Sequence, residues 1–142
     1  MFKGRILRVV LRVLDRITPA RRRAAHLETG TRGEEEAYFH LRKLGYVMVG
    51  RNFRSPRRRG ELDLVGWDGD TLCFVEVKTR TTRDVKPAEA AVDEDKQREL
   101  AVMAAEYMRR MEQKPRFRFD VVSVYYDRGD KEINLYKGAF GG

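Results

Sequence analysis

One stretch of the sequence decides the fold: residues 61–79 read ELDLVGWDGDTLCFVEVKT. Two runs of β-forming residues, 61–67 and 71–79, flank the segment Asp68-Gly69-Asp70. Glycine beside aspartate between two such runs is a strong signal for a tight turn that joins antiparallel strands. The stretch therefore predicts a β-hairpin.

The second strand of this hairpin carries charged residues directly after an apolar run. Residues 72–75 are all apolar, which indicates a strand buried on both faces. Glu76 and Lys78 follow two residues apart, so their side chains share one face at the end of the buried run. Burying a carboxylate or an ammonium group alone is costly, and these two groups must therefore be paired or coordinated.

The first strand faces this pair with two acids, Glu61 and Asp63, which also share a face. If the turn is centred on residues 69–70, Asp63 lies opposite Glu76 and Glu61 lies opposite Lys78. This register follows from matching the charged faces, because a slip of one residue turns every side chain to the other face. The Cβ atoms of directly opposed side chains lie roughly 4.5–5.5 Å apart.

Two opposed carboxylates repel unless a cation or a proton lies between them. Mg²⁺ takes oxygen ligands and commonly binds through one or two carboxylates together with substrate phosphates. Asp63 and Glu76 are therefore candidate metal ligands, and Lys78 could orient a water or stabilise charge on a phosphoryl group. The alternative is a plain cross-strand ion pair between Glu61 and Lys78, with Asp63 capping a turn or facing water.

The basic residues of the chain are concentrated before the hairpin. The 142 residues carry a formal net charge of +8, and residues 1–60 hold 16 Lys and Arg against 5 Asp and Glu. Residues 51–59, which include Pro56, are predicted to form a loop. Its arginines suit the phosphate backbone of a nucleic acid. They are Arg51, Arg54, Arg57, Arg58 and Arg59.

The remaining elements are predicted outward from the hairpin. Before it, a helix begins with the acidic first turn at Glu34 and stops at Gly45, and a strand follows over 46–49. After it, a helix spans 87–111, and strands span 117–126 and 133–136. This order predicts an α/β fold with a mixed central sheet flanked by helices. Lys96, on the apolar stripe of the second helix, either reaches an acidic or phosphate-rich site or extends to solvent.

The N-terminal segment, residues 1–28, reads as a basic amphipathic extension, with a helix over 2–17 that ends at Pro19. Such a helix packs on the domain, frays, or binds a partner, an anionic membrane surface or a nucleic acid. The main domain is expected over 29–137 and a flexible tail over 138–142.

Composition excludes several classes of protein. No run of about 18 apolar residues exists, so no integral membrane segment is expected. One Cys excludes an intramolecular disulfide, and with only two His it argues against a zinc site. Arg8 and Arg12 interrupt the N-terminal apolar stretch, which makes it a poor signal peptide. We therefore expect a cytoplasmic protein.

Several short motifs together resemble one family. They are Gly33-Glu34-x-x-Ala37, Leu44-Gly45-Tyr46, Arg51-Asn52-x-Arg54, Gly60-Glu61-Leu62-Asp63-Leu64 and Phe74-Val75-Glu76-Val77-Lys78-Thr79-Arg80. Over about residues 30–125 the chain is similar to the bacterial YraN-type family, a widespread and poorly characterised group. The resemblance implies a restriction-endonuclease-like fold with the PD-(D/E)xK nuclease core that archaeal Holliday-junction resolvases also use.

The resemblance also implies roles for individual residues. Asp63 and Glu76 match the two metal-binding acids, the Val77 carbonyl would face the metal, and Lys78 matches the catalytic lysine. Glu34 matches the helical glutamate of the resolvase-like branch. Leu62 stands where the core's name has Pro, a departure shared by many members of the wider superfamily.

The implied activity is a Mg²⁺- or Mn²⁺-dependent endonuclease that hydrolyses phosphodiester bonds in DNA, including branched or structured DNA. Arg80 and Lys96 are expected to add contacts to the nucleic acid. A homodimer would suit symmetric cleavage, although nothing in the sequence requires one. The alternative is a nucleic-acid-binding module whose nuclease core is silent or depends on a partner.

Overall fold

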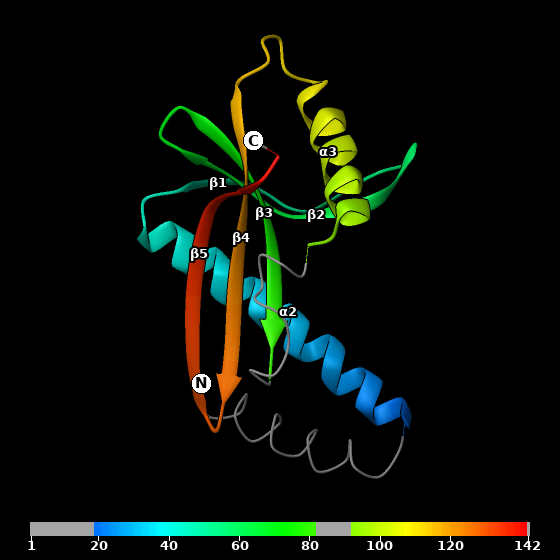
Figure 1. The fold of residues 1–142 in the computed structure, drawn as a ribbon, viewed down its shortest axis with the longest axis vertical. Coiled ribbons are helices and arrows are strands. Elements are labelled where there is room, and N and C mark those ends of the chain that lie inside the picture. Colours follow the sequence, from blue (N-terminus) through cyan, green and yellow to red (C-terminus); the bar gives the residue numbers. More distant parts are fainter. Residues whose placement is uncertain (1–18, 82–91, 142) are drawn as a thin grey trace.

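The computed structural model describes residues 19–81 and 92–141 (Figure 1). The order of helices and strands is the predicted one. The elements are α2 (Pro19–Lys43), β1 (Val47–Ser55), β2 (Arg58–Asp68), β3 (Thr71–Arg80), α3 (Glu94–Met108), β4 (Arg116–Asp127) and β5 (Asp130–Phe140). The helix predicted over 2–17 lies outside the described residues.

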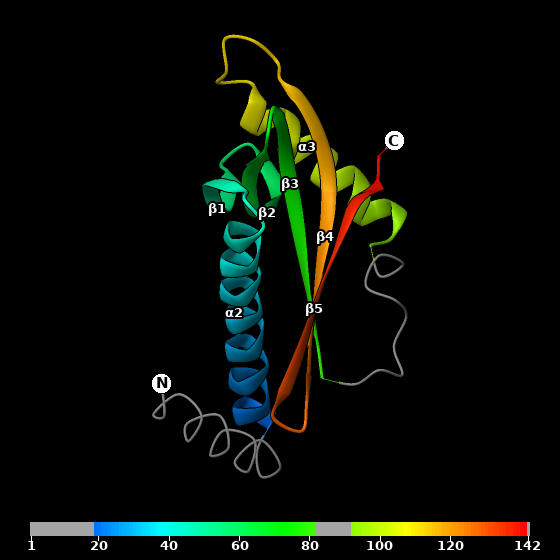
Figure 2. The same ribbon diagram turned by 90° about the vertical axis from the view of Figure 1, so that its left-hand side faces the viewer.

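The five strands form one mixed sheet in the order β1-β2-β3-β4-β5. Strands β3 and β4 run parallel, and every other neighbouring pair is antiparallel. Helix α2 covers one face of the sheet and α3 covers part of the other, as Figure 2 shows edge-on. The predicted α/β fold is therefore confirmed, and it is consistent with a restriction-endonuclease-like domain.

Where its strands pair, the β2–β3 hairpin has the predicted register, but the predicted pairs Asp63–Glu76 and Glu61–Lys78 lie beyond the end of the ladder. Leu64 pairs with Val75 and Asp68 pairs with Thr71, around a turn at Gly69 with φ +61°. Strand β3 is buried on both faces, because its successive side chains enter two different cores. Leu72 and Phe74 pack with Leu100 and Met103 on the α3 side; Cys73, Val75 and Val77 pack with Ala37 and Leu41 on the α2 side.

Helix α2 begins much earlier than predicted. It starts at Pro19, which we expected to end a helix, and it crosses the boundary expected at residue 28. Proline suits the first turn of a helix because no intrahelical partner awaits its missing N–H. Gly33, predicted to precede the helix, lies inside it and against β3. A Cβ atom added there would come 1.9 Å from the Thr79 hydroxyl oxygen, so the close approach of α2 to the sheet requires glycine.

The predicted loop over 51–59 is wrong. These residues belong mainly to β1 and β2, which pair from Val47 with Trp67 to Ser55 with Arg58. Only residues 56–57 form the turn. The basic stretch is therefore a protruding hairpin, called here the β1–β2 arm (residues 51–60). Arg110, two residues after the end of α3, lies over the Phe53 ring of this arm, and Ser55 donates to Glu106 on α3, so this helix and the residues after it support the arm.

Two further elements differ in length from their prediction. Helix α3 begins at Glu94, where the Asp93 side chain accepts the Lys96 N–H and caps it, and it ends at Met108 rather than at 111; the predicted start at Pro87 lies outside the described residues. Strand β5 spans Asp130–Phe140 and so includes residues 138–140, which we expected to be a loose end. Two contacts hold that end: the Gly138 N–H donates to the buried Asp120 carboxylate, and the Phe140 ring stacks on Phe119.

Candidate functional site

The candidate site lies at the fork where β2 separates from β3. Backbone pairing between these strands ends at Leu64 and Val75, and Asp63 is the next residue on β2. Its carboxylate accepts the Val77 backbone N–H at 2.9 Å. Leu62 and Leu64 enter opposite cores, although residues two apart normally share a face. The strand therefore turns at Asp63 and directs this side chain into the fork.

Glu76 and Lys78 line the fork from β3. Glu76 is only 6% exposed, and the Lys78 ammonium lies 3.6 Å from its Oε1 atom. Its other oxygen, Oε2, is buried and has no hydrogen-bond partner. Burial raises the pKa of Glu76, and the neighbouring Asp63 charge raises it further, while Lys96 and Lys78 oppose the shift.

The pKa of Asp63 is raised as well. Burial raises its pKa, and the charge of Glu61 adds to that effect, although the Val77 hydrogen bond acts in the opposite direction. Both acids of the fork thus have raised pKa values despite two nearby lysines. The positive charge supplied by the described side chains does not compensate for the carboxylates gathered here.

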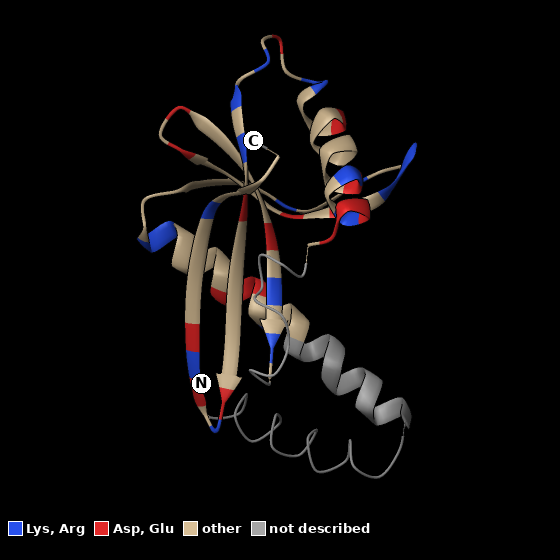
Figure 3. Cartoon of the chain, in the orientation of Figure 1, with Lys and Arg blue, Asp and Glu red and all other residues tan. Residues whose placement is uncertain are grey.

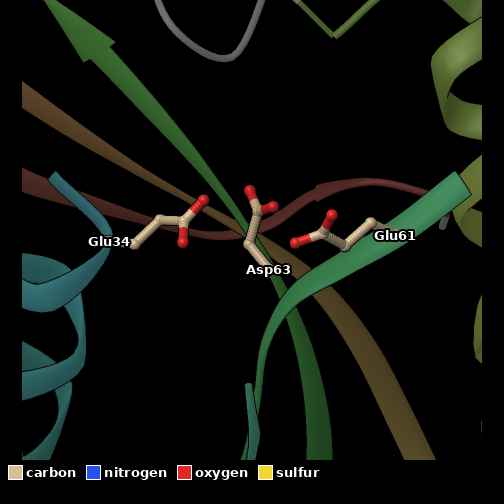
Figure 4. Close-up of side chains that lie close together, drawn as sticks. All are labelled: Glu34, Glu61 and Asp63. Carbon is tan, nitrogen blue, oxygen red and sulfur yellow. The ribbon is translucent and has the colours of Figure 1, made fainter. Parts of the chain in front are cut away.

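Two further acids lie beside Asp63, Glu34 from α2 and Glu61 from β2. One oxygen each from Glu34, Glu61 and Asp63 lie within 4.8 Å of one another, and Figure 4 shows the three side chains pointing toward a common space. Burial raises the pKa of Glu34 to about 7, with the charges of Asp63 and Glu61 contributing and Arg51 opposing. Glu34 therefore approaches the site from α2, as the sequence predicted.

Sequence reasoning missed Glu61 as a member of this acid group. The alternative expected from the sequence, an ion pair between Glu61 and Lys78, does not form among the described residues. Glu61 instead accepts from Arg54 at 2.7 Å, and Lys78 pairs with Glu76. The signal that could have found Glu61 was its shared strand face with Asp63.

Asn52 was also missed, although it belongs to one of the quoted motifs. It has a left-handed backbone, with φ +49°. Its amide nitrogen, oriented by its hydrogen-bond partners, lies 2.7 Å from Glu61 Oε1 and 3.1 Å from Glu34 Oε2. The amide therefore bridges two carboxylates that would otherwise repel each other.

Lys96 reaches the site from the first turn of α3. Its ammonium donates to Glu99 at 2.9 Å. Burial alone would lower the pKa of Lys96, but the carboxylates of Glu76, Glu99 and Asp63 outweigh it and raise the pKa. The structure therefore places Lys96 beside the acids rather than out in solvent.

The arginines expected to bind nucleic acid divide into three groups. Arg51 and Arg54 lie at the acids, Arg51 near Glu34 and Arg54 on Glu61. Arg57, Arg58 and Arg59 are exposed at the tip of the β1–β2 arm, the basic projection in Figure 3. Arg80, at the end of β3, is half-buried, and its Nε atom has no hydrogen-bond partner.

The sequence profile of a family described as "Uncharacterised protein family UPF0102" matches residues 33–124. The chain belongs to this family. The matched range contains every acid of the fork, both lysines and Asn52. Membership in UPF0102 confirms the resemblance to the YraN-type family.

Individual UPF0102 proteins match most of the chain. A relative in Koribacter versatilis is 52% identical over 132 residues, which cover 93% of this chain and 92% of the relative. A relative in Solibacter usitatus is 42% identical over 93% of this chain and 98% of its own length. One in Caldicellulosiruptor saccharolyticus is 40% identical over 80% of this chain and 97% of its own length. All three carry only the family designation as a name. No described helix is both long and apolar enough to span a membrane.

Proposed function

We propose that this protein is a Mg²⁺- or Mn²⁺-dependent nuclease that hydrolyses phosphodiester bonds in DNA, including branched or otherwise structured DNA. One observation carries the proposal: the buried Glu76 Oε2 atom has no hydrogen-bond partner, beside the half-buried acid Asp63. A buried polar atom without a partner costs free energy, and a cation between the two carboxylates would remove that cost.

The chemistry of the fork fits a hard divalent cation. The available ligands are carboxylate oxygens, which Mg²⁺ and Mn²⁺ prefer, and no described His or Cys lies among them. Asp63 and Glu76 would hold the ion together with the Val77 carbonyl. Because the N–H and C=O groups of one residue leave an extended strand on the same side, this carbonyl faces the side from which Asp63 approaches. A bound ion would polarise the phosphate and lower the pKa of its coordinated water.

The chain's own groups would complete the reaction. The Lys78 ammonium, beside Glu76, would orient the attacking water and stabilise negative charge that develops on the phosphate. Lys96 would contact the scissile phosphate from the opposite element, α3. Glu34, whose pKa is raised to about 7, is suited to accept a proton at neutral pH.

The β1–β2 arm would hold the nucleic acid. Its three exposed tip arginines offer phosphate contacts without sequence preference, and such contacts weaken with added salt. The DNA backbone would then run from the arm toward the acids at the base of β2.

The test is a cleavage assay on linear, nicked, single-stranded and four-way DNA with Mg²⁺, Mn²⁺ or EDTA. We expect metal-dependent cleavage that falls at least about 100-fold in Glu76→Gln and in Lys78→Met. Asp95→Asn, which changes an exposed acid on α3, is the matched control and should cleave like the unaltered chain. Cleavage that persists in Glu76→Gln would assign the activity to a contaminant and defeat the proposal.

The second candidate is a nucleic-acid-binding module whose nuclease core is silent or needs a partner, and the exposed arginine tip favours it. It predicts salt-sensitive DNA binding that survives Asp63→Asn and Glu76→Gln, without cleavage of any substrate. A triple substitution of Arg57, Arg58 and Arg59 to Gln would abolish that binding. Manganese uptake at the fork would distinguish a competent core from a purely binding one.

A further inference from the structure

An open surface pocket of about 490 Å³ lies between the end of α2 and the start of β1. This volume is within the range of small-ligand pockets, roughly 300–1,000 Å³. Aromatic and apolar side chains and one guanidinium group line it. The lining residues are Tyr38, Arg42, Gly45, Tyr46, Val47 and Met48.

Cations surround the Tyr38 ring of this pocket. The Arg51 guanidinium lies 5.0 Å from the ring centroid, and the Arg42 guanidinium lies 5.9 Å from it. Both arginines are exposed, and neither forms a salt bridge with a carboxylate of the described residues. Arg54 is different, because its guanidinium group forms a salt bridge with Glu61. The two guanidinium groups lie over the Tyr38 ring, so a phosphate bound by them would bring its base to the same ring, where the base would take a place on a ring face now covered by a guanidinium group.

The pocket adjoins the acids of the fork. Tyr38 lies four residues after Glu34 on α2, so the two side chains occupy the same face one turn apart. Arg51 joins the two places, because it lies over the Tyr38 ring and its charge lowers the pKa of Glu34. A nucleic acid held at the acids would therefore pass within reach of this pocket.

The two tyrosines of the pocket have different roles. The Tyr46 hydroxyl donates to the buried Asp120 carboxylate at 2.9 Å, and the residue is only 4% exposed, so it forms a fixed wall. Tyr38 is half-buried and borders the pocket from α2. Tyr38 is therefore the ring against which a ligand would stack.

We propose that this pocket binds one unpaired nucleotide of the substrate, with its base against Tyr38 and its phosphate on Arg42 and Arg51. The location beside the reaction site rests on the proposed nuclease function; the binding itself does not. Bases inside a duplex are already stacked and paired, so only a single strand, a tail or a branch end can place a base here. The inference thus narrows the substrate to nucleic acid with an unpaired base.

The test measures binding in EDTA, so that cleavage plays no part. A labelled oligothymidine and a blunt duplex of equal length serve as probes, and an oligouridine distinguishes RNA from DNA as the source of the base. Tyr38→Ala should weaken oligothymidine binding about 5- to 150-fold, the range for loss of one base–aromatic stack. It should leave duplex binding unchanged, and Tyr38→Phe should bind like the unaltered chain.

An exposed apolar residue away from the pocket supplies the matched control. Val102 lies on α3, is 41% exposed and does not line the pocket. Val102→Ala should therefore leave both affinities unchanged. A 2-aminopurine base in the oligonucleotide should lose fluorescence on binding to the unaltered chain and to Tyr38→Phe, but keep it with Tyr38→Ala. Equal weakening of single-strand and duplex binding in Tyr38→Ala, or no weakening, would overturn the proposal.

A second variant tests the pocket independently, so that the proposal can be checked even if Tyr38→Ala misfolds. Arg42 is exposed on the surface of α2, so Arg42→Gln should fold normally. It should weaken single-strand binding and reduce the salt dependence by about one phosphate contact. If Tyr38-dependent binding occurs without any cleavage, the nuclease proposal fails and the pocket stands. If cleavage occurs while Tyr38→Ala and Arg42→Gln bind normally, the pocket fails and the nuclease stands.

Discussion

The main chain of Val77 holds the carboxylate of Asp63 through a hydrogen bond of 2.9 Å between β3 and β2. This contact takes the place of the backbone ladder just where pairing between the two strands ends at Leu64 and Val75. Val77 lies between Glu76 and Lys78, so one strand segment positions both of these side chains and the acid opposite them. The geometry of the fork therefore depends on backbone rather than on long side chains.

Replacing Asp63 by Asn should separate metal binding from folding. The Asn carbonyl oxygen can still accept the Val77 N–H, so the fork keeps its shape. Manganese affinity should fall more than about 10-fold, because loss of a ligand costs at least as much as loss of an outer-shell partner. Thermal stability without metal should be unchanged or higher, since the Asp63 charge raises the pKa values of Glu76 and Glu34.

Titration calorimetry with Mn²⁺ and thermal unfolding in EDTA would measure these two effects. Asp70→Asn is the control, because Asp70 is an exposed acid at the turn of the same hairpin. Manganese bound equally well by Asp63→Asn would show that the fork is not the metal site.

The stability of the metal-free protein should depend on pH through Glu34. Its pKa rises from the usual 4.5 to about 7 in the folded protein. Between these values the folded state binds more protons than the unfolded state, so the free energy of unfolding falls as pH rises and levels off above about pH 7. The raised pKa of Glu76 acts in the same direction.

Metal should have the opposite dependence, because cations bind deprotonated carboxylates. The increase in melting temperature that Mn²⁺ produces should therefore grow from pH 5 to pH 8. Melting curves across this range, with EDTA and with Mn²⁺, provide the measurement. Glu34→Gln should flatten the metal-free profile, and an unaltered slope in that variant would be inconsistent with a raised Glu34 pKa.

The parts of this structure that sequence predicts are local. The hairpin register follows from the Asp68-Gly69-Asp70 turn and from matching charged faces, both of which lie within 19 residues (61–79). The start of α2 was misplaced because the acids after Gly33 look like a first helical turn. Glycine is required at residue 33 because α2 packs closely against Thr79 there, and Thr79 is distant in sequence.

The same distinction applies to the site. Asp63, Glu76 and Lys78 share one hairpin, and their proximity is readable from strand alternation. Arg54 and Asn52 reach Glu61 only because residues 51–59 pair as strands, and an arginine-rich stretch with Pro56 gives no sign of that pairing. Their contacts with the acids could not be inferred before the arm was seen.

Glu99 should tune the charge of Lys96. Its carboxylate accepts from the Lys96 ammonium at 2.9 Å and helps to raise the pKa of that amine. In Glu99→Gln the pKa of Lys96 should fall, as measured by NMR titration of labelled lysines. If the fork cleaves DNA, the rate should fall by less than the roughly 100-fold that loss of a positioned charge donor costs.

Helix α3 offers a matched control for this change. Asp95 and Arg98 form an ion pair with the same spacing of three residues as Lys96 and Glu99, but both side chains are largely exposed. Asp95→Asn should leave the pKa of Lys96 and any cleavage unaltered. A Lys96 pKa that is equally insensitive to Glu99→Gln would remove Glu99 from the site.

Two glycines of α2 should respond to alanine with opposite signs. Gly30 has open space around it, so Gly30→Ala should stabilise the protein by about 0.5–1 kcal/mol through better helix propensity. Gly33→Ala should destabilise it by about 1–3 kcal/mol, because the new methyl group would overlap the Thr79 side chain. Chemical denaturation of both variants gives the two free energies of unfolding.

The Gly33 change should also reach the acids, since Glu34 is the next residue. Moving α2 away from β3 draws the Glu34 carboxylate from Asp63 and Glu61, and its pKa should return toward 4.5. The double variant Gly33→Ala/Thr79→Ala removes the overlapping hydroxyl and methyl groups, so it should recover part of the lost stability and part of the raised pKa. Equal effects of alanine at residues 30 and 33 would mean that α2 does not approach β3 as closely as the structure has it.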